Sequence, residues 1–304
     1  KLEWREHPDP VPGTGEVLVR VRAAGLNGAD RLQVAGFYPP PPGYPVDIPG
    51  LELAGEVVAL GPGATRLSIG DRVMAVVGGG GQAELATVHE RHLLPVPDGV
   101  PWDQAGAFPE VFTTAHDALF TQCGLQLGER VCVHGAAGGV GIAAVQLAAA
   151  AGALVTATVR SEALRAHVAA LGATKVIAPD GFAEHGPFDV VLELVGAPNL
   201  PDDLRSLALG GRISVIGVGS GATAELHLLE LMSKRARIHG STLRARSLED
   251  KADAARRVER HVLPALADGT VRVPVHATFP MHEAPAAYAA FAAGGKLGKL
   301  VLTA

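Results

Sequence analysis

A glycine-rich stretch in the middle of the chain has the composition and the setting of a phosphate-binding loop. It reads His134-Gly-Ala-Ala-Gly-Gly-Val-Gly141, follows a short apolar run and precedes an alanine-rich one. Two of its glycines match the last two of the dinucleotide pattern G-x-G-x-x-G, and an alanine stands where the first would be. Such a loop lets the backbone approach a pyrophosphate at the positive end of the following helix. We therefore predict a dinucleotide site formed by Ala137, Gly138, Gly139, Val140 and Gly141.

The residues about twenty positions further on indicate which dinucleotide is bound. A site that prefers NAD usually carries an Asp or Glu there for the ribose 2′-hydroxyl. This chain has Arg160 and Ser161 instead. Arg160 could pair with a 2′-phosphate, and Ser161 could donate a hydrogen bond to it. We therefore predict NADPH as the cofactor; the alternative is that Arg160 is only an exposed loop residue.

The elements around this loop alternate between apolar strands and helices, which is typical of a doubly wound parallel sheet of the Rossmann type. We expect six strands, at residues 130–134, 154–159, 175–177, 188–194, 212–216 and 237–243. Helices are expected at 139–151, 162–171, 202–209 and 225–233. The fold class is therefore α/β.

The first hundred residues have a different pattern. Short runs that alternate apolar and polar residues, such as 16–22, are separated by proline-rich and glycine-rich turns, which predicts an antiparallel, partly open β-barrel. A helix at 248–267, a strand at 271–279, a helix at 283–293 and a strand at 298–302 finish the chain. We place a catalytic domain at 1–111, completed by 265–304, and a dinucleotide-binding domain at 112–264.

Composition excludes several other classes of protein. The 304 residues carry a net charge of −5, which argues against a nucleic-acid partner. Two cysteines are too few for a disulfide scaffold or a four-cysteine zinc site, and they favour a reducing compartment, so we expect a cytoplasmic protein. The charge-free run 134–159 is broken by glycines, so we expect two soluble elements there and no membrane span.

Eight segments spread along the chain carry a resemblance to one family, the zinc-free quinone oxidoreductases of the medium-chain dehydrogenase/reductase superfamily, in the zeta-crystallin-like branch. They are Ala24–Asp30, Gly36–Pro39, Pro49–Gly55, Gly70–Val73, Pro109–Ala115, His134–Gly141, Gly210–Arg212 and Gly298–Leu300. The resemblance implies a GroES-like barrel beside a Rossmann domain. It also implies hydride transfer from a nicotinamide to a small electrophile in the cleft between them.

The resemblance also implies roles for individual residues. Asn27 and Tyr38 would be the catalytic pair beside the cofactor, with Tyr38 matching a proposed proton donor of related enoyl reductases. Thr114 would lie on the nicotinamide side. Other cofactor contacts would come from Gly217 and Gly219 near the ribose and from Ser241, Thr242 and Leu243 near the carboxamide.

No metal is expected at this site. Relatives that bind zinc place a Cys where this chain has Asn27 and a His where it has Leu51. A leucine cannot ligate a metal, so the residues that would assemble a zinc site are missing. Reduction of a simple ketone then lacks a Lewis acid. A quinone needs less help, because its ring delocalises the charge that it accepts, so a small quinone is the first substrate prediction.

Other functions remain open from the sequence. The enzyme could reduce an enone, a 2-alkenal or an enoyl thioester, and Arg244 and Arg246 could then form a basic mouth for a thioester carrier. A protein of another class, an NADPH-binding structural or regulatory protein with little turnover, is the third hypothesis. The resemblance further implies a homodimer formed through the sheet edge at 237–243.

Overall fold

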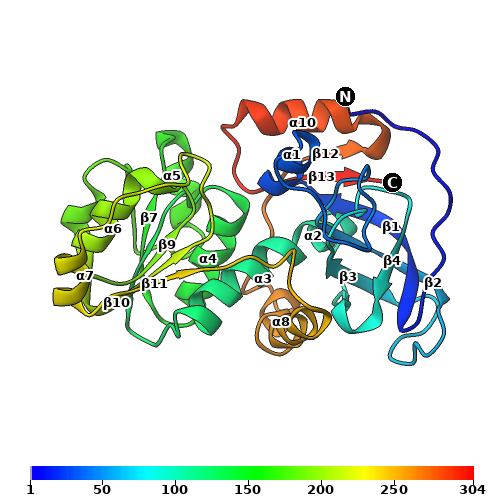
Figure 1. The fold of residues 1–304 in the computed structure, drawn as a ribbon, viewed down its shortest axis with the longest axis horizontal. Helices are drawn as coiled ribbons and strands as arrows, with labels where there is room; N and C mark the ends of the chain where they lie inside the picture. Colours follow the sequence, from blue (N-terminus) through cyan, green and yellow to red (C-terminus); the bar gives the residue numbers. More distant parts are fainter. Residues whose placement is uncertain (1) are drawn as a thin grey trace. The chain divides into compact units, whose positions relative to one another are not determined.

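Six parallel strands form the sheet that the alternating pattern predicts (Figure 1). They are β6 (Arg130–Val133), β7 (Leu154–Thr158), β8 (Lys175–Ile177), β9 (Phe188–Glu193), β10 (Leu207–Val215) and β11 (Arg237–Gly240). Their order across the sheet is β11-β10-β9-β6-β7-β8. Counted along the chain, this is the doubly wound order 3-2-1-4-5-6, in which β6 lies between the two halves. The Rossmann prediction is confirmed.

Helices pack against this sheet because their apolar residues and those of the strands share one core. The helices are α4 (Gly139–Ala150), α5 (Glu162–Ala169), α6 (Leu200–Ser206) and α7 (Leu228–Lys234), with short 3₁₀ turns η3 (Phe182–His185) and η4 (Ala197–Asn199). Helix α4 lies against β6 and β7, α5 against β8, and α6 and α7 against β10. Buried Phe188 and Leu204 are part of the resulting core.

One expected helix ends earlier than predicted. The sequence predicts helix at 202–209, but α6 ends at Ser206 and β10 begins at Leu207. Leu207 pairs with Phe188 on β9, and the register then shifts before Arg212. Gly210, with φ of +79°, lies in the shifted segment. A glycine adopts this backbone conformation readily, which allows an irregularity that periodicity does not reveal.

The second sheet is mainly antiparallel and forms around the long strand β1 (Glu16–Gly25). Its alternating pattern buries Val17, Val19 and Val21 on one face. The remaining strands are β2 (Glu52–Leu60), β3 (Arg72–Val76), β4 (Leu85–His89), β5 (Leu94–Pro95), β12 (Val275–Pro280) and β13 (Lys299–Thr303). Strand β1 pairs with β2, β4 and β13, so the C-terminal strand returns to the sheet formed by the first hundred residues, as predicted.

The other helices surround this second sheet or connect the two sheets along the chain. They are α1 (Gly28–Val34), α2 (Trp102–Ala107), α3 (Pro109–His116), α8 (Leu248–His261), α9 (Leu263–Ala267) and α10 (Ala284–Ala293). Shorter turns are η1 (Glu90–His92), the π-helical η2 (Asp117–Gln122) and η5 (Met281–Glu283). Helix α2 contacts β1 and β2, and α10 contacts β12 and β13.

The computed structural model describes residues 2–304 and divides into two units. The GroES-like unit contains the chain up to Thr113 together with Leu243–Ala304, and the Rossmann unit is Thr114–Thr242. The predicted boundaries were 111 and 264, so residues 243–264 move to the GroES-like unit. Helix α8 explains this change: Arg256 donates to the carbonyl of Leu93 at 2.5 Å, and Glu249 pairs with Arg91.

No helix within residues 2–304 combines the length and the apolar character needed to cross a bilayer.

Candidate active site

The glycine-rich loop connects β6 to α4 at the point where the sheet order reverses. Gly138 is the N-cap of the twelve-residue helix α4 and has an extended conformation. A Cβ at Gly141 would lie 2.6 Å from both the Cα of Ala136 and the carbonyl oxygen of Gly135. Only glycine therefore fits at 141, where helix and loop touch. The first N–H groups of α4 are in the position that suits a pyrophosphate.

A second glycine is needed at the end of β10. A Cβ at Gly217 would overlap the backbone of Leu194, the first residue after β9, whereas Gly219 has open space around it. The N–H of Gly217 donates to the carbonyl of Glu193 at 3.1 Å. The ends of β9 and β10 are therefore held together at the same edge of the sheet as the glycine-rich loop, as expected of a Rossmann cofactor site.

A fully buried polar cluster lies behind these loops. It consists of His134, Glu193 and Asp203. The Nε2 atom of His134 lies 2.8 Å from Asp203 Oδ1, and its Nδ1 lies 3.1 Å from Thr158 Oγ1. With the proton on Nε2, the ring donates to Asp203 and accepts from Thr158. The cluster thereby ties the ends of β6 and β7 to helix α6.

Glu193 holds the loop after β9. Its carboxylate accepts from the backbone N–H of Val195 and of Gly196 and from Asn199 Nδ2. These hydrogen bonds occupy both carboxylate oxygens of Glu193. The 2.8 Å contact between His134 and Asp203 is also a hydrogen bond. Within residues 2–304 this is the one group of three side chains whose atoms are close enough for a metal ion. Because the side chains of this group are already hydrogen-bonded to protein atoms, we assign no metal to it.

Burial changes the protonation of this cluster. It lowers the pKa of His134, so the ring is neutral, and it raises the pKa of Asp203 to about 7. Asp203 Oδ2 is buried and has no hydrogen-bond partner. A buried carboxylate oxygen without a donor disfavours the charged form. Asp203 therefore holds a proton at a pH where an exposed aspartate would be ionised.

Arg160 and Ser161 follow β7 and are exposed. Ser161 is the N-cap of α5, and its side chain makes no capping hydrogen bond. The neighbouring Arg165, which the sequence reasoning did not single out, donates to the carbonyl of Val159 at 3.2 Å. Two guanidinium groups therefore lie on the segment where the sequence predicts the 2′-phosphate, and no carboxylate occurs among residues 154–161.

The GroES-like unit contains a second buried polar network, which includes Asn27. The ammonium of Lys299 donates to the carbonyl of Leu26 at 2.8 Å, to Asn27 Oδ1 at 2.6 Å and to Glu52 Oε1 at 2.7 Å. Asn27 Nδ2 donates to Glu52 Oε1 at 2.8 Å. Glu52 Oε2 accepts from the backbone N–H of Glu110 at 2.9 Å. All three ammonium protons are thus used, and the amide of Asn27 has a fixed orientation.

Asp30 extends the network toward α10. It accepts from the backbone N–H of Asn27 at 2.8 Å and of Gly50 at 3.2 Å. Gln82 lies 3.4 Å from Asp30 and accepts from the hydroxyl of Tyr288 at 2.9 Å. Burial raises the pKa of Asp30 to about 7. The loop that carries Asn27 is therefore fixed from β2, from the 78–82 loop and from α10.

Tyr38 lies in a loop and is half-buried beneath Arg244. The guanidinium carbon of Arg244 is 4.8 Å from the centre of the Tyr38 ring. Arg244 itself is buried and donates to the carbonyls of Gly78 at 2.7 Å and Tyr38 at 2.6 Å and to Gln33 Oε1. Burial raises the pKa of the Tyr38 hydroxyl above its usual value. Arg244 thus fixes the Tyr38 loop from within the unit.

The remaining predicted residues lie at the ends of the Rossmann unit or just beyond it. Thr114 is buried in α3. Ser241 follows β11 and donates to Asp117 at 2.8 Å, Thr242 is exposed, and the side chain of Leu243 is buried. Asn27 and Tyr38 belong to the GroES-like unit. The glycine-rich loop, Gly217 and Ser241 belong to the Rossmann unit.

Three residues of the Asn27 network escaped the sequence reasoning: Asp30, Glu52 and Lys299. Each is charged and at most 2% exposed. A weak signal exists, because charged residues stand there within otherwise apolar runs, for example Leu51-Glu52-Leu53 and Lys299-Leu300-Val301. Charged side chains are almost never fully buried unless they are paired. The partners themselves are up to 273 positions apart, which no local pattern reveals.

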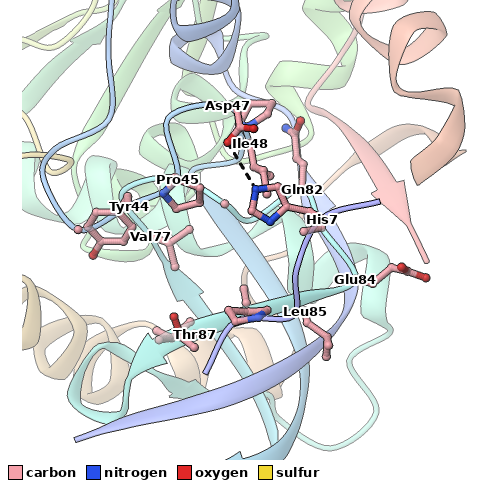
Figure 2. Close-up of a pocket in the computed structure, with 18 of the residues that line it drawn as sticks. His7, Tyr44, Pro45, Asp47, Ile48, Val77, Gln82, Glu84, Leu85 and Thr87 are labelled. Carbon is pink, nitrogen blue, oxygen red and sulfur yellow. Dashed lines mark ion pairs between the residues drawn. The ribbon is translucent and has the colours of Figure 1, made fainter. Parts of the chain in front are cut away.

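A large cavity lies elsewhere in the GroES-like unit. It encloses about 1020 Å³ between the N-terminal segment, residues 41–49 and β4. Figure 2 shows His7 and Asp47 on one side, joined by an ion pair of 3.8 Å, and Leu85 and Thr87 of β4 on the other. Asn27, Tyr38 and Thr114 do not line it. We therefore do not assign the cofactor or the substrate to this cavity.

Family models match both units. Residues 13–98 match the Alcohol dehydrogenase GroES-like domain, and residues 139–260 match the Zinc-binding dehydrogenase model. The rat quinone oxidoreductase (Rattus norvegicus) is 31% identical over 96% of this chain and 90% of its own length. The acryloyl-coenzyme A reductase of Metallosphaera sedula is 32% identical over 99% of this chain and 96% of its own length.

Two further matches are a polyketide synthase and a solved structure that contains NADPH. Polyketide synthase GfsB of Streptomyces halstedii is 35% identical over 99% of this chain, which spans 5% of that protein's length. A mycobacterial protein solved in complex with NADPH has a TM-score of 0.89 and 27% identity, covering 99% of this chain and 95% of that one. The fold and the dinucleotide loop define an oxidoreductase that uses a nicotinamide cofactor. The chain belongs to the medium-chain dehydrogenase/reductase superfamily, among the relatives of quinone oxidoreductase.

The match to the Zinc-binding dehydrogenase family raises the question of whether the residues around Asn27 could bind zinc. An amide, a buried leucine and a carboxylate stand at Asn27, Leu51 and Glu52, and Lys299 fills the polar centre with an ammonium. Zinc sites in proteins use thiolate, imidazole and carboxylate ligands. A cationic amine hydrogen-bonded to the same carboxylate would repel a metal ion. This donor set does not fit zinc.

The first prediction concerns the glycine-rich loop. Gly141→Ala should weaken NADPH binding by at least tenfold, because the added methyl group must push α4 away from Ala136 and thereby displace the N–H groups at its start. Fluorescence titration with NADPH measures the Kd. The control is Gly240→Ala, where a Cβ meets nothing within 4 Å. Unchanged binding in Gly141→Ala would contradict the assigned loop.

The second prediction concerns Asp203. Its pKa is raised by folding to about 7, so the folded protein binds more protons than the unfolded chain between about pH 4 and pH 7. The free energy of unfolding should therefore decrease as pH rises through this range. Asp203→Asn should remove part of that decrease, since an amide cannot ionise. Urea unfolding of both proteins at pH 5 and pH 8 measures the effect, and an identical pH dependence would refute it.

Proposed function

We propose that this protein is an NADPH-dependent quinone reductase that transfers hydride to a small quinone without zinc. The observation that carries the proposal is the set of three hydrogen bonds that the Lys299 ammonium donates, to Leu26, Asn27 and Glu52. The ammonium thereby occupies the middle of the polar network beside Asn27. With no metal-binding donor set there, the substrate must accept hydride without a Lewis acid. A quinone meets this requirement because its ring spreads the negative charge. The match to rat quinone oxidoreductase supports the proposal.

NADPH would be held mainly by the Rossmann unit. The pyrophosphate would meet residues 137–141, the nicotinamide ribose would meet Gly217 and Gly219, and the carboxamide would meet Ser241, Thr242 and Leu243. When bound, the cofactor supplies the hydride. The chain's own contribution would be position: Thr114 and Asn27 beside the nicotinamide, and Tyr38 beside the substrate as a hydrogen-bond donor. We keep Asn27 and Tyr38 as the proposed catalytic pair.

A second candidate function is reduction of an enone, a 2-alkenal or an enoyl thioester. The similarity to acryloyl-coenzyme A reductase over 99% of this chain favours it. The basic mouth suggested for a thioester carrier loses Arg244, because that guanidinium is buried and bonded to Gly78, Tyr38 and Gln33. Of the two arginines suggested for that mouth, Arg246 alone would remain, so the quinone stays the first candidate.

We also propose a homodimer and a cytoplasmic location. Strand β11 is the last strand of the Rossmann sheet and has one unpaired edge. The adjoining α7 exposes Leu228, Leu229 and Met232, each more than 60% exposed. Apolar side chains beside an open strand edge favour association with a second copy. Both cysteines are unpaired and buried, in agreement with a reducing compartment.

The substrate test is oxidation of NADPH at 340 nm with 9,10-phenanthrenequinone, a 2-alkenal and acryloyl-CoA, each with and without a chelator. We expect turnover of the quinone that the chelator does not change. Turnover of acryloyl-CoA or the 2-alkenal alone would replace the quinone by the second candidate. Tight NADPH binding with no turnover in any arm would favour the structural or regulatory protein and overturn the enzyme assignment.

The cofactor test is Arg160→Ala. Losing a charge-assisted hydrogen bond to the 2′-phosphate removes about 1.5–3 kcal/mol, so the KM for NADPH should rise by about 10- to 100-fold. The KM for NADH should not change, because NADH lacks that phosphate. Arg205→Ala is the matched control, since Arg205 is an exposed arginine of the same unit paired with Asp202. Equal effects on both cofactors would exclude Arg160 from phosphate recognition.

A further inference from the structure

Glu110, the second residue of α3, has a carboxyl group without a partner. Its Oε2 is buried and makes no hydrogen bond, and within residues 2–304 no donor bonds to either oxygen. The residue as a whole is only partly buried. Its backbone N–H, by contrast, is bonded to Glu52. The main chain of Glu110 is thus fixed, while its carboxyl group has no hydrogen-bond donor among the residues that the structure describes.

The charged groups around Glu110 do not supply a donor. Two of them are carboxyl groups, Glu52 and Asp30, whose charge opposes ionisation of a third. Three are cations, Lys299, Arg244 and Lys251, and the Nζ atom of Lys251 donates to the hydroxyl of Tyr44 at 3.4 Å. The three protons of Lys299 go to Leu26, Asn27 and Glu52, and Arg244 bonds to other groups of its own unit. Burial, with these carboxyl neighbours, raises the pKa of Glu110 to about 8.

The position of Glu110 links it to the proposed catalytic pair. Glu52 bonds to both the Glu110 backbone and the Asn27 side chain, so one carboxylate holds the two residues side by side. Glu110 is also close enough to Tyr38 for its charge to raise the pKa of that hydroxyl. Because the pKa of Tyr38 is raised above its ordinary value by burial, its hydroxyl gives up a proton less readily near neutral pH than a carboxylic acid does.

We propose that Glu110 is a catalytic residue, the general acid that delivers the proton to the reduced substrate. Tyr38 would then orient the substrate oxygen by a hydrogen bond, and the proton would come from the carboxyl group next to it. This inference rests on the proposed reductase function. The polar network holds the backbone of Glu110 in place, whereas no hydrogen-bond donor from the described part of the chain reaches its carboxyl group.

The step balances as follows. A quinone carbonyl accepts hydride from the cofactor, which is oxidised, and an oxygen of the substrate gains negative charge. That oxygen takes the proton of the Glu110 carboxyl, forming an O–H bond and leaving Glu110 as carboxylate. For an enone the same proton ends on the enolate. Solvent returns one proton to Glu110 before the next turnover, so one hydride and one proton are consumed for each substrate reduced.

The test is the pH dependence of kcat/KM in Glu110→Gln, measured with 9,10-phenanthrenequinone and with acryloyl-CoA from pH 6 to pH 10. Wild type should lose activity as pH rises through about 8, where Glu110 ionises. Glu110→Gln should be slower by about 10²-fold below pH 8, since an amide donates no proton in turnover. It should also lack the decrease near pH 8. Its Kd for NADPH should equal that of wild type.

Two further variants complete the experiment. Glu110→Asp keeps an acid and should recover part of the rate together with a pH-dependent decrease, which a merely structural role would not produce. Glu283→Gln, at an exposed glutamate of the same unit, should match wild type. If Glu110→Gln does not fold, Glu110→Asp alone decides: a pH profile identical to wild type overturns the proposal, and a displaced profile supports it.

The outcomes separate the two proposals. A wild-type protein without turnover on any substrate overturns the reductase function, and the role of Glu110 with it. An active wild type whose profile is unchanged in Glu110→Gln overturns only the role of Glu110. A large loss in Glu110→Gln with the decrease near pH 8 retained would also overturn it, because another group would then supply the proton.

Discussion

The ion pair between Lys299 and Glu52 is the interaction on which the GroES-like unit depends most. It joins β13, which ends the chain, to β2, and through the same atoms it fixes Asn27 and the start of α3. Both charges are removed from water, which is costly unless every remaining polar atom is satisfied. Here the ammonium has three acceptors and the carboxylate has three donors. Removing one partner would leave the other charge buried and alone, at a cost of about 3–5 kcal/mol.

The Rossmann unit follows the same design. His134, Glu193 and Asp203 hold the ends of three strands from behind, and the loops that could bind a cofactor lie in front of them. In both units, then, several segments proposed for chemistry are loops, and a buried polar network replaces the ladder hydrogen bonds that loops lack. Such networks give a loop one conformation because any other would leave a buried polar atom unpaired. This matters for hydride transfer, which depends on accurate placement of the reacting atoms.

Much of this fold could be predicted from the sequence, because its signals are local. Apolar runs between helical stretches predict the six strands of the Rossmann sheet, and the glycine-rich loop gives the place where the sheet reverses. The start of β10 was not predictable, since Gly210 permits an irregularity with no periodic signature. The domain boundary at 243 was not predictable either. Helix α8 is amphipathic, and amphipathicity shows that a helix has a buried face but not which unit it packs against.

The candidate site shows the same limit more sharply. Asn27 and Tyr38 are proposed from their motif, whereas Glu52, Lys299 and Glu110 required the fold, because their partners are distant along the chain. That difference bears on the chemistry. Within residues 2–304, Lys299 is the one cation bonded to Asn27. Its charge is matched by Glu52 and its protons are all used, so it has little capacity to stabilise an oxyanion. The help this site can still give a substrate is a proton, and such help suits acceptors whose negative charge is already delocalised, such as quinones and activated alkenes.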